Sequence, residues 1–103
     1  MHTVALHIAP DHPAFAGHFP GQPLLPGVLL LAEVLEAVLD APALARDVGP
    51  APRIAATKFL APVRPGARLT LHLASDTRGV RFEVREGDRV AASGQFEPAG
   101  GWP

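Results

Sequence analysis

A single histidine in a proline-rich loop is the side chain of this sequence best placed to do chemistry. His18 lies between Gly17 and Phe19 in the segment FAGHFPGQPLLPGV, residues 15–28. Prolines and glycines hold this segment in turns and extended pieces that cannot continue a helix. An imidazole, with an unperturbed pKa near ~6.5, can take up a proton and return it at neutral pH. The alternative is that His18 only hydrogen-bonds to the loop backbone.

A helix is predicted to begin directly after this loop. Pro26 and Gly27 precede Val28–Asp40, a run without a helix breaker that is followed by Pro42. The free backbone N–H groups around the helix start, together with the helix dipole, form a site for developing negative charge such as an enolate or oxyanion. A general base beside an anion-stabilising site is therefore one function that these residues predict.

The predicted helix is apolar nearly all round. Its exceptions are Glu33, Glu36 and Asp40, whose spacing of three and four places them on one stripe of the helix. We expect everything else on the helix to be buried, as in a helix that is wrapped by a sheet. The acidic stripe itself is typical of a solvated surface.

Alternating apolar residues predict five strands around this helix. Val4, Leu6 and Ile8 mark the first strand. The other four are Ile54–Val63, Arg68–Ser75, Val80–Arg85 and Arg89–Phe96. They face the core through Leu69, Leu71, Leu73, Val80, Phe82 and Val84, and His72 falls on the opposite face. The fold class is thus α+β, a curved antiparallel sheet around one long buried helix, and its edge strands favour sheet-to-sheet dimerisation.

Length and composition restrict the function classes. The 103 residues predict one domain over residues 1–103, with a flexible tail at 98–103. A net charge of −1 argues against nucleic acid and anionic lipid as partners, and we expect neither a signal peptide nor a membrane span. The absence of cysteine excludes disulfides and thiolate metal sites and allows a cytoplasmic location. The histidines outside the loop lack the spacing of a metal site, so we expect no metal.

Two motifs resemble one known family. Gly17-His-Phe-Pro-Gly-x-Pro-x-x-Pro-Gly-Val28 is similar to the active-site loop of the hotdog-fold 3-hydroxyacyl-[acyl-carrier-protein] dehydratases. Lys58-Phe-x-x-Pro-Val-x-Pro-Gly-x-x-Leu69 is similar to the strand and turn that follow the helix in that family. The resemblance covers residues from about 3 to 97, and the short chain looks closer to the small dehydratase-like proteins of polyene and aryl-polyene pathways. It implies a hotdog fold.

The resemblance also implies a mechanism. His18 matches the catalytic histidine that takes the α-proton, and Gly27 matches the glycine whose backbone N–H stabilises the enolate. The substrate is a 3-hydroxyacyl thioester carried on the phosphopantetheine arm of an acyl carrier protein, in a tunnel at a dimer interface, and no other cofactor is implied. Substrate-binding positions are expected at Phe19, Pro20, Gly21, Pro26 and Val28.

One position departs from the family pattern. The family carries a helix carboxylate fourteen residues after the motif histidine, where this chain has Ala32. Glu33 should face away, whereas Glu36 keeps nearly the same direction about 6 Å further along the axis. Three outcomes follow: His18 works alone; the chain is a catalytically weak partner that completes another dehydratase; or Glu36, Glu33 or a different partner subunit supplies the acid. We rank them in that order, with Glu36 as the candidate carboxylate.

Two further expectations concern partners and reaction. Residues 1–50 hold one basic against five acidic side chains, and residues 51–89 hold eight basic against four acidic. Because acyl carrier proteins are acidic, this asymmetry favours docking at a basic rim; the residues expected there are Arg53, Lys58, Arg64 and Arg68. We expect a homodimer or a higher even oligomer, or a heteromeric dehydratase. A hotdog thioesterase remains an alternative function, favoured if Glu36 lies beside the Gly27 N–H across the dimer.

Overall fold

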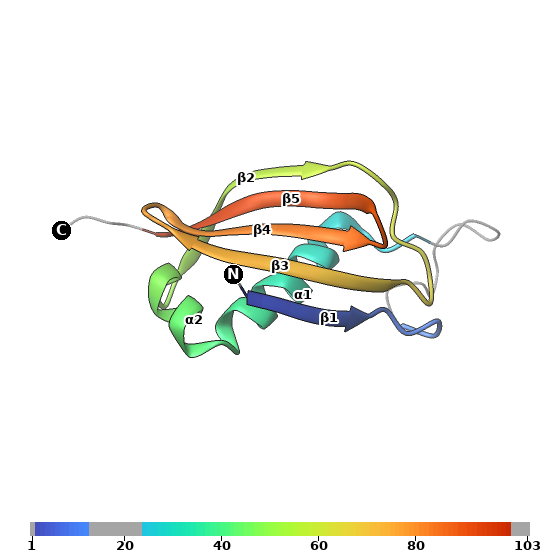
Figure 1. Cartoon of the computed structure of the whole chain (residues 1–103), viewed down its shortest axis with the longest axis horizontal. Coiled ribbons are helices and arrows are strands. Elements are labelled where there is room, and N and C mark those ends of the chain that lie inside the picture. Colours follow the sequence, from blue (N-terminus) through green and yellow to red (C-terminus); the bar gives the residue numbers. More distant parts are fainter. Residues whose placement is uncertain (1, 13–23, 100–103) are drawn as a thin grey trace.

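Five antiparallel strands form one sheet that curves over a helix (Figure 1). The computed structural model describes residues 2–12 and 24–99. The strands are β1 (His2–His7), β2 (Pro52–Phe59), β3 (Arg68–Asp76), β4 (Gly79–Glu86) and β5 (Arg89–Pro98), and the helices are α1 (Gly27–Leu39) and α2 (Pro42–Val48). The strand order is β1-β3-β4-β5-β2, so β1 and β2 are the two edges.

The apolar faces of the central strands form the core, as the alternation predicts. Leu71 of β3 pairs with Val84 of β4, and Leu73 pairs with Phe82. All four side chains are at most 1% exposed. The rings of Phe82 and Phe96 stack with their centroids 5.0 Å apart, which joins β4 to β5 on this inner face. The predicted inward faces of β3 and β4 are therefore confirmed.

Helix α1 packs only one of its sides on the sheet. Leu30, Leu31, Val34 and Val38 are buried, at the spacing of a single helix face. The expectation that all its apolar residues are buried is wrong, since Val28 is 72% exposed and Leu39 is exposed as well. The physical reason is geometric, because one curved sheet covers one side of a helix and leaves the opposite side open.

Two prolines, Pro42 and Pro98, lie in regular secondary structure where the sequence predicted none. Pro42 does end α1, but it also begins the unpredicted helix α2, because the first helical position needs no N–H donor. Leu44 and Val48 of α2 are buried against the core. Strand β5 extends to Pro98, which pairs with Pro52, so Pro98 belongs to the sheet and not to the expected tail, whose last residues, 100–103, lie outside the described residues.

Strand β2 ends at Phe59, four residues before the predicted end at Val63. Beyond Phe59, the N–H groups of Leu60 and Ala61 both point at the carbonyl oxygen of Ala91, at 2.9 and 3.2 Å, and the next residue is a proline without an N–H, so the regular pairing of the strand stops there.

Within the parts of the chain that the structure describes, no helix is long and apolar enough to cross a bilayer.

The turn between β3 and β4 depends on one carboxylate. Asp76 Oδ1 accepts hydrogen bonds from the backbone N–H of Arg78 at 2.8 Å, from that of Gly79 at 3.0 Å and from Gln95 Nε2 at 3.1 Å. The Arg78 backbone N–H is the largest of the influences that lower the pKa of Asp76 below its usual value of 3.8. Since these donors favour the charged form, Asp76 holds the hairpin more firmly when it is ionised.

This predicts an acid-sensitive hairpin. A lowered pKa in the folded state contributes stability above the ordinary value of 3.8, and that contribution is lost as the pH falls through the folded-state value. In Asp76→Asn, the decrease in Tm on going from about pH 6 to about pH 3 should therefore be smaller than in the unmodified chain. Thermal unfolding followed by circular dichroism measures this, with Asp88→Asn in the next hairpin as the matched control. An unchanged decrease in Asp76→Asn would contradict the role of Asp76.

Candidate functional site

An apolar cleft opens where α1 begins and β2 ends. Its volume is about 600 Å³. It is lined by Leu24, Leu25, Gly27, Val28, Leu30, Phe59, Leu60, Ala61, Pro62 and Val63. Every one of these side chains is apolar or absent, so the cleft suits the body of an apolar ligand.

Backbone N–H groups of the first helical turn border this cleft. Pro26 precedes the helix, and its carbonyl oxygen accepts from the N–H groups of Leu29 and Leu30 at 3.0 and 3.1 Å. The N–H groups of Gly27 and Val28 lie earlier and have no helical acceptor, because no helical residue precedes them. The helix start therefore presents donors and the positive end of its dipole beside an apolar cleft.

The ring of Phe59 occupies the space that a side chain at position 27 would need. A Cβ atom at Gly27 would lie 2.6 Å from Cζ of Phe59 and 2.9 Å from each Cε atom. Because real Cβ atoms essentially never come that close to another heavy atom, the ring of Phe59 could keep this position against the first turn of α1 only with glycine at position 27. Phe59 is itself 53% exposed, so the ring forms one wall of the cleft without being locked in the core.

Exposed apolar side chains continue from the cleft along both elements. Val28 begins the open side of α1 and Leu39 ends it, and Ala32 on this side is exposed as well. On β2 and just after it, Ile54 is 51% exposed and Leu60 is 59% exposed. We call the set Val28, Ala32, Leu39, Ile54, Phe59 and Leu60 the open apolar face. Apolar surface gathered at an unpaired sheet edge is typical of an interaction site.

The motif residues divide between described and undescribed parts of the chain. His18, Phe19, Pro20 and Gly21 lie outside the described residues. Of the others, Gly27 and Val28 line the cleft and Pro26 caps the helix with its carbonyl group. The structure thus brings Gly27 and Val28 together with Phe59, for which the sequence predicted no role in the site.

The acidic stripe of α1 lies away from this cleft. Glu33, Glu36 and Asp40 line a separate groove of about 400 Å³ beside β1, at the other edge of the sheet. Glu33 also lies near His12, with 3.8 Å between Oε1 and Nε2. Within one chain, Glu36 is therefore not among the residues of the cleft. Among the described residues, no three His, Asp or Glu side chains gather where they could hold a metal ion.

The four basic residues expected at a docking rim are spread over both ends of the sheet. Arg53 lies at the start of β2, where its Nη2 is 2.8 Å from Oε1 of Glu97. Lys58 lies at the other end of the same strand, about 16 Å away at the rise of an extended chain. Arg68 begins β3, and Arg64 lies in the loop before it, with two strands between β3 and β2.

Sequence reasoning missed Phe59, Leu60 and Leu24 as parts of the cleft. A signal for the first two exists, since Phe59 and Leu60 are consecutive apolar residues close before Pro62. In a strand with one buried face, two such neighbours cannot both point into the core. Leu24, in contrast, is one apolar residue among several in a proline-rich loop, and nothing in its spacing indicates where it lies.

Comparisons with known proteins identify the family. The model of the ApeI-like family, described as ApeI dehydratase, matches residues 1–95. A 3-hydroxyacyl-[acyl-carrier-protein] dehydratase FabZ of Wolbachia pipientis is 39% identical over 90 residues, which cover 84% of this chain and 62% of the relative. The FabZ of Dechloromonas aromatica is 33% identical over 98 residues, covering 84% and 68% of the two chains. The chain thus spans about three fifths of the length of the Wolbachia relative.

Solved structures show the same fold. The dehydratase heterocomplex ApeI:P from Xenorhabdus doucetiae contains a chain that matches with a TM-score of 0.75 and 29% identity, covering 92% of this chain and 83% of that one. The fluoroacetyl-CoA-specific thioesterase FlK matches with a TM-score of 0.62 and 16% identity, covering 94% and 86%. The second likeness shows the fold alone. Together they confirm the hotdog architecture predicted from the sequence.

The contact between Gly27 and Phe59 predicts a measurable coupling. Gly27→Ala should destabilise the chain relative to the same substitution made in a Phe59→Ala background, because only the unmodified ring obstructs the new methyl group. The difference should be about 1 kcal/mol, the size of a modest overpacking penalty. Urea unfolding of the four proteins of this cycle measures it. Equal effects of Gly27→Ala in both backgrounds would show that the ring does not pack on the helix start.

Proposed function

The chain belongs to the ApeI-like dehydratase family, and from this premise we propose that it removes water from a 3-hydroxyacyl thioester on an acyl carrier protein. The product is the trans-2-enoyl thioester. The single observation that carries the proposal is the apolar cleft whose wall includes the start of α1, since it pairs space for an acyl chain with backbone donors for a thioester oxygen. FabZ relatives with this named activity support it.

The reaction needs an acidic α-carbon and a leaving hydroxyl group. In our proposal the backbone N–H of Gly27 donates to the thioester carbonyl oxygen and stabilises the enolate that forms there. His18 takes the α-proton as general base. The enolate then collapses as the C3–O bond breaks, and the protonated imidazole returns its proton to the departing hydroxyl, which leaves as water. The phosphopantetheine arm of the carrier presents the thioester, and Phe19, Pro20, Gly21, Pro26 and Val28 are proposed to contact the substrate.

Ala32 provides no carboxylate, so in our proposal both proton transfers fall to His18. In the structure Ala32 lies on the exposed side of α1, one turn after Val28. No carboxylate of α1 shares the cleft of its own chain, because the acidic stripe faces the groove beside β1. We therefore propose that His18 acts as both base and acid. One acid–base group contributes about 10²–10⁴-fold, which leaves a slower but competent dehydratase.

A second chain is part of the proposal. Strand β2 is an edge strand, and the open apolar face lies on it and on α1. We propose that another hotdog chain pairs with this edge, closing the cleft into a tunnel. The pair is a homodimer or a higher even oligomer built from such dimers, and we propose that it works in the cytoplasm.

A catalytically weak partner subunit is the second candidate function. Two observations favour it, namely the alanine at position 32 and the likeness to a chain of a dehydratase heterocomplex. In that case a different hotdog chain would cover β2 and bring the missing carboxylate. Glu36 of a second copy is the remaining source of an acid.

The test is conversion of a 3-hydroxyacyl carrier-protein thioester, with mass spectrometry separating loss of water from loss of the acyl group. The unmodified chain should release water, and His18→Ala should be slower by at least about 10²-fold, with His7→Ala on β1 as the matched control. A comparable decrease in Glu36→Gln would assign the second acid to Glu36. Loss of the acyl group instead of water would contradict dehydration, and inertness of the chain alone, restored by a second hotdog subunit, would favour the partner role.

A further inference from the structure

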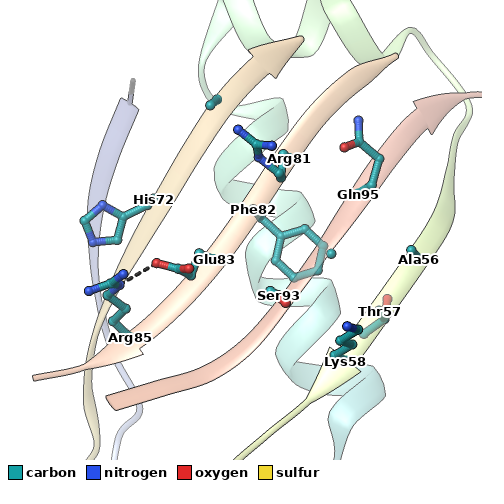
Figure 2. Close-up of a pocket in the computed structure, with 12 residues that line it drawn as sticks. Ala56, Thr57, Lys58, His72, Arg81, Phe82, Glu83, Arg85, Ser93 and Gln95 are labelled. Carbon is teal, nitrogen blue, oxygen red and sulfur yellow. Dashed lines mark hydrogen bonds and ion pairs between the residues drawn. The ribbon is translucent and has the colours of Figure 1, made fainter. Parts of the chain in front are cut away.

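The face of the sheet turned away from α1 carries a hollow of about 770 Å³, larger than the cleft (Figure 2). Strand register sets two rows of side chains across β3, β4, β5 and β2. One row runs His72, Glu83, Ser93 and Lys58, and the next runs Ala74, Arg81, Gln95 and Ala56. Residues directly opposite each other on neighbouring strands have Cβ atoms about 5 Å apart, so each row is continuous.

Small residues form the floor of this hollow and keep it open. Ala56, Ala74 and Ser93 are short, so they leave the space between the long side chains open. Gly94 also borders the hollow, but it lies between Ser93 and Gln95 in β5, so a Cβ atom there would point to the inner face, 2.6 Å from Cζ of Phe82. The long side chains of Lys58, Arg81 and Arg85 stand around this floor (Figure 2).

The charge of the hollow is positive. Glu83 is its one carboxylate, and it is already ion-paired with Arg85. Among the described residues, no acidic oxygen lies within ion-pair distance of Lys58 or Arg81, and the carboxylate of Asp76, which accepts from Gln95 at the border of the hollow, attracts Arg81 only from beyond that distance. The acidic residues of α1 line the groove beside β1 instead, at the far edge of the sheet from β2. An acidic partner is therefore attracted to the outer face and repelled from the β1 side.

Strand β2 places this hollow directly behind the cleft. Lys58 and Phe59 are consecutive residues and point to opposite faces of the strand. Lys58 lines the hollow, and Phe59 lines the cleft at the start of α1. The hollow and the cleft thus lie on opposite faces of the same end of β2. A ligand attached to a partner that is bound in the hollow reaches the N-terminus of α1 by passing around that end of the strand.

We propose that this outer-face hollow, with Lys58, Arg81 and Arg85, is the surface on which the acidic acyl carrier protein docks. The inference rests on the proposed function. It replaces the dispersed set of four basic residues expected from the sequence with a single surface, and of that set it keeps only Lys58. Arg81 and Arg85 are added because they line the same hollow as Lys58, to which the pairing of β4, β5 and β2 brings them from distant parts of the sequence.

The test compares three double charge reversals that change the net charge equally. K58E/R81E alters the hollow, R64E/R68E alters the alternative rim at the start of β3, and R46E/R89E alters exposed positions on α2 and β5. For each variant, kcat/KM is measured with the carrier-bound substrate and with a 3-hydroxyacyl pantetheine thioester that has no carrier. Binding of the carrier is also measured by calorimetry at about 0.05 and 0.3 M salt, since screening weakens such contacts.

K58E/R81E should lose about tenfold or more in kcat/KM with the carrier substrate and most of the salt dependence of binding, while the pantetheine thioester is converted as before. R46E/R89E should match the unmodified chain in both assays. A decrease confined to R64E/R68E, or no decrease in any variant, would overturn the inference. So would loss of self-association in K58E/R81E, which would assign the hollow to a second copy.

These outcomes are distinguishable from failure of the proposed function. If the unmodified chain converts neither substrate, dehydration by the chain alone fails. The docking inference is still decided in that case, because calorimetry with the carrier compares the same three variants without turnover. Unweakened binding in K58E/R81E overturns the inference, and selective weakening in that variant supports it.

Discussion

One constraint organises this molecule: a helix that is apolar nearly all round is covered by its own sheet on one side only. Leu30, Val34 and Val38 are buried against the strands, whereas Val28, Ala32 and Leu39 face outward. Apolar side chains on the outward side gain little from folding of the single chain, since water still reaches them. Burial of one side of the helix therefore stabilises the single chain, and the other side leaves apolar surface exposed.

The candidate site follows from the same constraint. The edge strand β2 ends beside the start of α1, and there Phe59 packs on Gly27 at the border between covered and open helix. The cleft lies at that border. Its apolar wall, Phe59, and its backbone donors at the helix start are therefore brought together by the contact between Phe59 and Gly27. The opposite face of the same strand end carries Lys58, which links the cleft to the polar outer face of the sheet.

Much of the architecture could be predicted from local pattern. The alternation of Leu69, Leu71 and Leu73 specifies a strand with one buried face, and the acidic residues of α1 do fall on one stripe. Helix α2 was missed because Pro42 serves equally as a stop and as a first helical residue. The exposure of Val28 could not be predicted, since a sequence shows which residues are apolar but not which of them the chain's own sheet can reach.

The site is less readable than the fold for a related reason. Gly27 and Val28 could be found because they belong to a contiguous motif, and the structure places both in the cleft. Phe59 is thirty-two positions further along the chain, and only the pairing of β2 with β5 brings it to the helix start. The outer-face row from His72 to Lys58 likewise depends on register across four strands, which no local pattern contains.

The central claim is that a second chain covers the open side of α1 along β2. The most direct test is sedimentation of two purified variants, each with one added charge on a different edge of the sheet. Ile54→Asp on β2 should weaken the dimer by about tenfold to a hundredfold, as expected from the burial of one large apolar side chain. Thr3→Asp on the opposite edge β1 should leave the dimer intact. A dimer that resists Ile54→Asp but dissociates in Thr3→Asp, or a chain that is monomeric both alone and with hotdog partners, would contradict the account.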